Sequence, residues 1–247
     1  MQPVNYDIIA PAFDRRYERN AYDGVRAVLH RFSGALPDAV VLEVGCGSGH
    51  WLADLSSHGV RRLLGVDRSA RMLELAKVAA PNACLVRAEA TSLPWSNRSV
   101  DRVFCVNALH HFPEQQPFLA ECRRVLRPGG GVLTVGLDPH GGQDRWWVYD
   151  YFPAALSADR QRYRSTHTIR EWLSAVGFES PVTEVAETFS AEIPFALAWQ
   201  QGMVDRRATS QFMVISDREY ERGVARLMAE QPVLRSEVRL YATSAWL

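Results

Sequence analysis

The chain contains 247 residues, enough for one sizeable domain with a packed core. Apolar residues make up 47% of it, and 28 basic residues balance 28 acidic ones, so the formal net charge is zero. A balanced charge gives no electrostatic basis for a nucleic-acid partner, because proteins of that kind usually carry a basic excess. No window of about 18 uninterrupted apolar residues occurs, so we expect no membrane span.

The N-terminal stretch contains acidic residues and no long apolar core, so it is not expected to be a signal peptide. The four cysteines, Cys46, Cys84, Cys105 and Cys122, are far apart in the sequence and form no C-x-x-C pair. This spacing indicates reduced thiols in a cytoplasmic protein and supports neither a zinc site nor a disulfide scaffold. We therefore expect a cytoplasmic protein without a bound metal, and the sequence leaves its oligomeric state open.

Apolar runs alternate with segments of helical period from residue 39 to 138, which is typical of βαβ units and a parallel sheet. Strands are expected at 39–44, 62–67, 83–89, 100–109 and 131–138. Helices are expected at 49–57, at 70–80 with Ser69 as N-cap, and from residue 113 up to a stop at Pro128-Gly129-Gly130.

The regular alternation weakens after Asp138. A helix is expected at 168–177, strands at 182–189 and 236–247, and helical or irregular structure at 191–232. No internal repeat or low-complexity linker occurs, so we expect one domain in four parts. These are N-terminal helices at 1–38, a ligand-binding core at 39–138, substrate-side helices and a sixth strand at 139–232, and a last strand at 233–247.

Three glycines, Gly45, Gly47 and Gly49, stand at alternate positions between the first strand and the first helix of the core. A glycine turn at a helix N-terminus is expected to place backbone N–H groups and a positive dipole against a ligand. The dinucleotide fingerprint is G-x-G-x-x-G, but here His50 occupies the position of its third glycine. Glu43 precedes the loop, where a carboxylate would suit a cationic or zwitterionic group better than a diphosphate.

Two further acids follow the next two strands. Asp67 ends the second strand, 22 residues after Gly45, where a carboxylate can accept hydrogen bonds from both hydroxyls of a ribose. Glu89 ends the third strand, where it could accept from an exocyclic adenine amine. Each acid alone is more often a solvated loop residue, but three acids around one glycine loop indicate a nucleoside site.

Four segments carry a family resemblance: VLEVGCGSGH, GVDRSARMLELA, AEATSLPWSNRSVDRVFCVNALHHF and RVLRPGGGVLTV. They resemble the class I S-adenosylmethionine-dependent methyltransferases, and most of all the type 11 group of quinone-biosynthesis and small-molecule enzymes. The resemblance is dense over residues 40–137 and extends to the segment 6–17. It implies an α/β, Rossmann-like fold with a seven-stranded, mostly parallel sheet, an antiparallel last strand and flanking helices, here with a helical, aromatic cap insertion.

The resemblance also implies a cofactor site for S-adenosylmethionine. Glu43 and the backbone of Gly45, Cys46 and Gly47 would hold its methionine end, and Asp67 would bind the ribose. The residues implied around the adenine and the reactive slot, with two tyrosines that would close over the cofactor, are Arg68, Met72, Glu89, Ala90, Asn107, Ala108, Tyr6 and Tyr17. Glu89 replaces the aspartate that is usual in the family.

His110 and His111 are the predicted catalytic residues, because a base after the fourth strand could deprotonate a phenol or alcohol acceptor. Adjacent residues cannot both face the site, and a packing role for both histidines is an alternative at least as well supported. His140 and His167 are alternative bases without a spacing argument. The cofactor already activates the methyl group, so the chain has mainly to position the reactants and exclude water.

An aromatic cluster follows the fifth strand and includes Trp146, Trp147, Tyr149 and Tyr151. It predicts a small organic acceptor with an aromatic or apolar body, methylated at oxygen, nitrogen or carbon, although a cap that buries its own aromatics is an equal alternative. The fourth strand lacks the N-P-P-Y motif of many base-amine methyltransferases, which also disfavours nucleic acid. Two other functions stay open: a cofactor-binding protein without methyl transfer, and, less favoured, an NAD-linked oxidoreductase.

Overall fold

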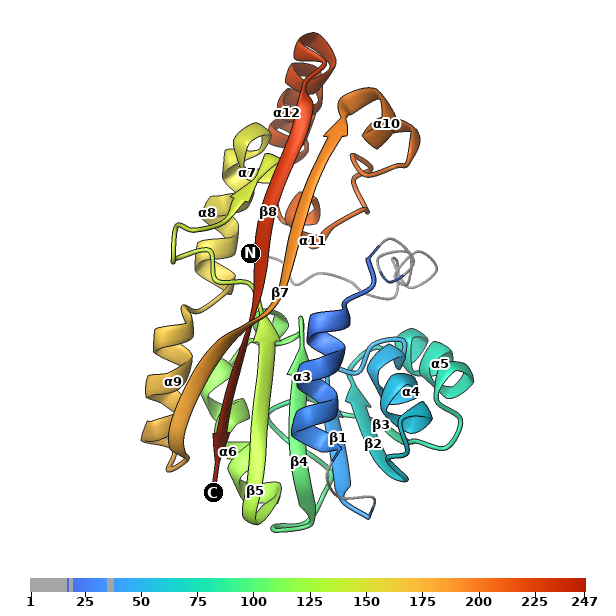
Figure 1. Ribbon diagram of the computed structural model, residues 1–247, viewed down its shortest axis with the longest axis vertical. Coiled ribbons are helices and arrows are strands. Elements are labelled where there is room, and N and C mark those ends of the chain that lie inside the picture. The colour runs from blue at the N-terminus through green and yellow to red at the C-terminus, as the bar shows by residue number, and fades with distance from the viewer. Residues whose placement is uncertain (1–16, 18–19, 35–37) are drawn as a thin grey trace. The chain divides into compact units, whose positions relative to one another are not determined.

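The computed structural model describes residues 17, 20–34 and 38–247 (Figure 1). The described chain divides into two compact units. The sheet unit contains the described residues up to Gly136 together with Thr166–Glu187 and Leu240–Leu247. The helix-rich unit contains Leu137–Ser165 and Thr188–Arg239.

The described helices and strands follow the alternation that the sequence predicts. In the sheet unit they are α3 (Asp23–Ser33), β1 (Val40–Val44), α4 (His50–Ser57), β2 (Arg62–Asp67), α5 (Ala70–Ala79), β3 (Cys84–Arg87), β4 (Val100–Val106), the 3-10 turn η2 (Leu109–His111), α6 (Gln115–Val125), β5 (Leu126–Gly136) and α9 (Thr166–Ala175). In the helix-rich unit they are β6 (Arg145–Trp146), α7 (Trp147–Tyr151), α8 (Pro153–Arg162), α10 (Phe195–Gln200), α11 (Ser210–Met213) and α12 (Asp217–Glu230). Two long strands, β7 (Glu179–Pro194) and β8 (Val233–Trp246), have residues in both units.

The sheet confirms the predicted fold class. Its order is β3-β2-β1-β4-β5-β8, with β1 to β5 parallel and β8 antiparallel to β5. The described residues form eight strands, whereas the sequence predicts seven; the additional strand is β6, which has two residues and pairs with β8. A strand of two residues is too short to be recognised from an alternating pattern in the sequence.

Local sequence signals set most element boundaries. The hydroxyl of Ser69 caps α5 as predicted, because it accepts a hydrogen bond of 3.1 Å from the backbone N–H of Met72. The predicted helix that begins near residue 113 ends earlier than expected, at Val125, because Leu126 already has an extended backbone and joins β5. Leu126 pairs with Val100 of β4, so pairing in the sheet ends the helix before Pro128 is reached.

One face of the sheet is packed against α6 and α9. Side chains at alternate positions of β1, such as Leu42 and Val44, share a buried cluster with Phe118 of α6 and Leu173 of α9. Figure 1 shows α3 in front of β1 and β4, so the sheet carries helices on both faces. Parallel strands end at the same edge, and that edge gathers the loops after β1, β2 and β4. Among the described residues no helix is long and apolar enough to cross a membrane.

Candidate functional site

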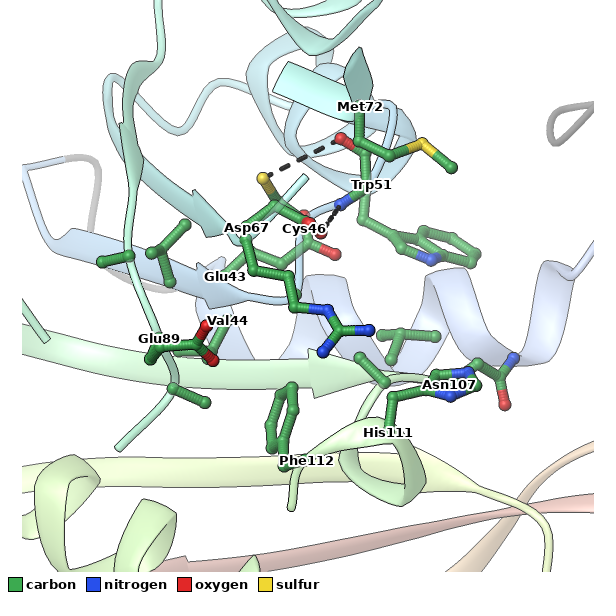
Figure 2. A pocket seen from close by; sticks show the side chains of 18 of the residues that line it. Glu43, Val44, Cys46, Trp51, Asp67, Met72, Glu89, Asn107, His111 and Phe112 are labelled. Carbon is green, nitrogen blue, oxygen red and sulfur yellow. Dashed lines mark hydrogen bonds between the residues drawn. The ribbon is translucent and has the colours of Figure 1, made fainter. Parts of the chain in front are cut away.

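A pocket lies where β1, β2 and β4 end in the sheet unit (Figure 2). It is lined by Tyr17, Glu43, Val44, Gly45, Cys46, Gly47, Trp51, Val66, Asp67, Arg68, Met72, Ala88, Glu89, Ala90, Val106, Asn107, Ala108, His111 and Phe112. Ligands of open α/β sheets bind at this edge, outside the carboxyl ends of the strands. The three acids that the sequence singled out, Glu43, Asp67 and Glu89, all line the pocket.

The glycine loop does not offer its N–H groups as the sequence predicts. The N–H groups of Gly45 and Cys46 both donate to the carbonyl of Val66, at 2.8 and 3.0 Å. The N–H of Gly47 donates to the Asp67 carboxylate at 2.9 Å, and that of Gly49 to the Cys46 carbonyl at 2.9 Å. These four donors are satisfied inside the protein, so a ligand must find its hydrogen-bond donors elsewhere.

Two of the glycines are required by contacts with the protein itself. A Cβ atom on Gly45 would lie 2.5 Å from the Cβ of Ala108, and one on Gly49 would lie 2.9 Å from the Cα of Ala76. Both glycines also have positive φ angles, +76° and +82°, which L side chains rarely adopt. Gly45 therefore lets the loop after β4 approach the loop after β1, and Gly49 lets α5 approach the start of α4.

Asp67 joins three elements. One carboxylate oxygen accepts from the N–H of Gly47 and the other from the N–H of Ser69, at 2.9 and 2.8 Å. Burial raises the pKa of Asp67, while these backbone donors act in the opposite direction because they favour the charged form. Carboxylate oxygens have further lone pairs, so the side chain can hold the loop and still accept from a ligand hydroxyl.

Glu43 is buried at the end of β1 without full compensation. Its side chain is 1% exposed, and its Oε2 atom has no hydrogen-bond partner among the described residues. Burial, reinforced by the nearby charge of Asp67, raises the pKa of Glu43 well above its ordinary value. An unpaired buried carboxylate is costly, and a ligand cation or N–H donor in the pocket would remove that cost.

The pocket brings most of the predicted cofactor residues together. The predicted residues that line it are Tyr17, Glu43, Gly45, Cys46, Gly47, Asp67, Arg68, Met72, Glu89, Ala90, Asn107 and Ala108. Tyr6 lies outside the described residues. Asn107 has a φ of +50° and donates its N–H to Val135 at 2.8 Å, so the turn after β4 is held at the pocket. Asparagine tolerates this left-handed backbone conformation better than most residues.

The two predicted catalytic histidines differ in position. His111 lines the pocket, whereas His110 is 8% exposed and is not among the lining residues. Their rings nevertheless lie close, with centroids 3.8 Å apart. Both belong to η2, a single 3-10 turn after β4, which turns successive side chains in different directions.

The four predicted substrate aromatics lie in the helix-rich unit. Trp147 is 4% exposed and belongs to a buried cluster with Phe152 and Phe212. The hydroxyl of Tyr149 donates to the buried Asp159 at 2.7 Å, and that of Tyr151 donates to Glu230 at 2.8 Å. Trp146 contacts Tyr149 edge to face. Their role toward an acceptor stays a prediction.

Sequence reasoning missed two aromatic residues of the pocket, Trp51 and Phe112. Trp51 is the second residue of α4 and is 2% exposed. Its position just after the glycine loop was the available signal, because side chains in the first turn of that helix can reach back toward the strand ends. Phe112 follows the two histidines and packs edge to face on Phe118.

Residues 42–134 match the family model described as a methyltransferase domain. An uncharacterized methyltransferase of Mycolicibacterium paratuberculosis is 34% identical over 149 residues, which is 58% of each chain. A demethylmenaquinone methyltransferase of Renibacterium salmoninarum is 28% identical over 172 residues, or 69% of each chain. The chain thus spans less than two thirds of the length of the first of these relatives.

Solved structures share the fold. A methyltransferase of Anabaena variabilis, described as part of an antibiotic biosynthesis pathway, superimposes with a TM-score of 0.68 at 21% identity, over 89% of this chain and 96% of that one. A phosphoethanolamine N-methyltransferase of Haemonchus contortus, in complex with S-adenosylmethionine, gives 0.59 at 19% identity, over 91% of this chain and 52% of that one. At these identities the likeness concerns the fold alone.

We expect Gly45→Ala to destabilise the protein more than Gly129→Ala. Both glycines have nearly the same φ, +76° and +75°, so both variants incur a similar backbone strain. The new Cβ at position 45 meets Ala108 at 2.5 Å, whereas that at position 129 meets nothing within 4 Å. Overpacking of this kind costs roughly 1–3 kcal/mol. Chemical denaturation of both variants measures the difference; equal losses would show that the loop after β4 yields freely.

We expect Glu43→Gln to stabilise the ligand-free protein at neutral pH. Burial raises the folded-state pKa of Glu43, so its contribution to stability is present below its ordinary value of 4.5 and is lost as the pH rises through the raised value. The advantage of the variant should therefore shrink as the pH falls toward 4.5. Thermal melts across this range test the trend, with Glu74→Gln on the exposed face of α5 as the control. A pH-independent difference would contradict the expectation.

Proposed function

We propose that this chain, whose residues 42–134 match the model of a methyltransferase domain, transfers a methyl group from S-adenosylmethionine to a small organic acceptor. One observation carries the proposal. The pocket at the strand ends combines a buried carboxylate without a full set of partners, that of Glu43, with a second carboxylate at the end of β2, that of Asp67. A ligand that joins an amino acid to a nucleoside fits both groups: its ammonium suits Glu43, and its ribose hydroxyls suit Asp67.

The side chains in the pocket fit such a cofactor. Glu43 would pair with the ammonium of the methionine part, which supplies the partner that its Oε2 atom lacks. Asp67 would accept from the ribose hydroxyls while it holds Gly47, and the buried thioether of Met72 would pack against the adenine. Glu89, which is exposed at the end of β3, would accept from the adenine amine. The fit supports S-adenosylmethionine over NAD, since a diphosphate beside Glu43 would be repelled.

In the reaction, the chain would position the two reactants and exclude water from them. When bound, the cofactor supplies a methyl group already activated by its sulfonium. The residues after β4, Asn107 and Ala108, line the pocket and would position the acceptor for in-line displacement. Tyr17 lines the same pocket and packs edge to face on Trp51, with ring centroids 5.8 Å apart, so it would help to exclude water.

A base is needed only where the acceptor holds a proton at working pH. His111 is the candidate that the pocket favours, because it is a lining residue and its ring is half-buried. His110 would then support it from the neighbouring position. The alternative bases differ in setting: His167 is exposed beside Glu171, and His140 lies in the helix-rich unit with its ring nitrogen 3.1 Å from the carbonyl of Tyr163.

The acceptor itself is proposed from composition and from the aromatic cluster. Residues 139–232 would supply the acceptor side, with Trp146, Tyr149 and Tyr151, which are partly buried, as contacts. The burial of Trp147 in a core cluster gives it a packing role first. The demethylmenaquinone methyltransferase among the relatives favours a flat, apolar acceptor, and the zero net charge disfavours nucleic acid.

Four unpaired cysteines favour a cytoplasmic location.

Two assays test the proposal: first cofactor binding, then methyl transfer. Calorimetry should show binding of S-adenosylmethionine and of its demethylated product, and none of NAD. Incubation with methyl-labelled cofactor and a panel of phenols, amines and carboxylic acids should then show transfer to one class. Binding without transfer to any acceptor would favour a cofactor-binding protein without activity, and binding of NAD would favour an oxidoreductase.

We expect Asp67→Ala to weaken cofactor binding by roughly 1–3 kcal/mol, because ligand hydroxyls would lose a charged acceptor and the Gly47 N–H would lose its partner. Asp54→Ala is the matched control: this carboxylate pairs with Arg26 and His30 and does not line the pocket. Calorimetry on both variants measures the loss. Unchanged affinity in Asp67→Ala would contradict the ribose assignment.

We expect His111→Ala to lower turnover of a phenol or alcohol acceptor by about 10²- to 10⁴-fold, the usual contribution of a general base, with cofactor affinity retained. An amine acceptor that is neutral at the assay pH should be affected much less. His110→Ala serves as the comparison, since His110 is buried beside the pocket. Wild-type turnover of a protonated acceptor by His111→Ala would exclude the histidine as the base.

A further inference from the structure

Trp51 has a polar atom that the fold leaves without a hydrogen bond. Its side chain is 2% exposed, and its indole Nε1 has no hydrogen-bond partner among the described residues. Buried N–H donors are almost always paired, and leaving one unpaired costs about 1–3 kcal/mol. Figure 2 shows the indole ring among the side chains that line the pocket. A ligand in this pocket could therefore supply the missing acceptor.

The indole is held in place by other rings. Tyr17, Tyr22 and His50 each meet Trp51 edge to face or nearly so, with ring centroids 5.8, 6.1 and 4.7 Å away. Such contacts fix the ring plane and hence the direction of its N–H bond. A donor that is already oriented costs less entropy to use in binding than a flexible side chain would.

The setting of Trp51 favours an anionic acceptor. It lies in the first turn of α4, where the helix dipole attracts negative charge and no acidic side chain is present. Four backbone donors of the preceding loop, those of Gly45, Cys46, Gly47 and Gly49, are already used within the protein. On the side of the pocket that α4 lines, the indole N–H of Trp51 is a donor still available to a ligand.

We propose that Trp51 Nε1 binds the carboxylate of the amino-acid part of the cofactor. The inference rests on the proposed function and completes its ligand: Glu43 Oε2 needs a donor and Trp51 Nε1 needs an acceptor, and an α-amino acid carries an ammonium and a carboxylate on one carbon. The two side chains divide the recognition between them. Glu43 selects the ammonium and Trp51 selects the carboxylate.

The test compares three ligands by calorimetry: S-adenosylmethionine, its decarboxylated form, which keeps the amine, and 5′-methylthioadenosine, which lacks both groups. Trp51→Phe, which keeps an aromatic ring but removes the N–H, should weaken S-adenosylmethionine binding about 5- to 100-fold. It should leave the affinities for the other two ligands unchanged. Glu43→Gln is the matched control and should weaken both amine-bearing ligands while sparing 5′-methylthioadenosine.

A second measurement does not depend on a variant that must fold. In protein labelled with ¹⁵N at the tryptophan indoles, the Trp51 signal should move downfield with S-adenosylmethionine and much less with the decarboxylated form. Equal weakening of all three ligands by Trp51→Phe, or an indole signal that responds equally to both amine-bearing ligands, would overturn the inference and leave the proposed function intact. A wild-type protein that binds none of the three would overturn the proposed function itself, and the inference with it.

Discussion

The Asp67 carboxylate is the interaction on which the site depends. Its two oxygens accept from the backbone N–H groups of Gly47 and Ser69, so one side chain at the end of β2 fixes the loop after β1 and the start of α5. A carboxylate is suited to this because it can accept several hydrogen bonds at once. The same group lines the pocket, so a single residue both holds the loop and faces the cavity.

This arrangement changes the role of the glycine loop. The loop would be expected to present N–H groups to its ligand, yet those of Gly45, Cys46, Gly47 and Gly49 are used to hold the loop against β2 and against itself. The glycines serve close approach between protein segments, as the contacts of Gly45 with Ala108 and of Gly49 with Ala76 show. Two side chains around the loop, those of Glu43 and Trp51, carry buried polar atoms without partners among the described residues. Such atoms cost stability in the ligand-free protein, and occupancy of the pocket would recover it.

The helix-rich unit has a hydrophobic core of its own. This core is built around Trp147, Phe152 and Phe212, so some of the aromatic residues that follow β5 serve in packing. It also contains a buried polar group, Asp159, which accepts from Tyr149 and from Gln211. A buried carboxylate needs such donors, and they restrain the tyrosine that the sequence proposed as an acceptor contact. The packing of that unit therefore limits the freedom of the Tyr149 side chain.

The sequence by itself determined the alternation of strands and helices, the N-cap of α5, the mostly parallel character of the sheet and the acids at the carboxyl ends of its strands, because each depends on local pattern or on motif spacing. It could not fix the end of α6, where Leu126 leaves the helix before Pro128, or the two-residue β6, because such boundaries depend on pairing with distant strands. It also could not separate His111 from His110 or find Trp51. Which side chain of a turn or helix faces a pocket, and which donors are already used, depends on contacts between segments far apart in the chain. Only the tertiary structure decides those.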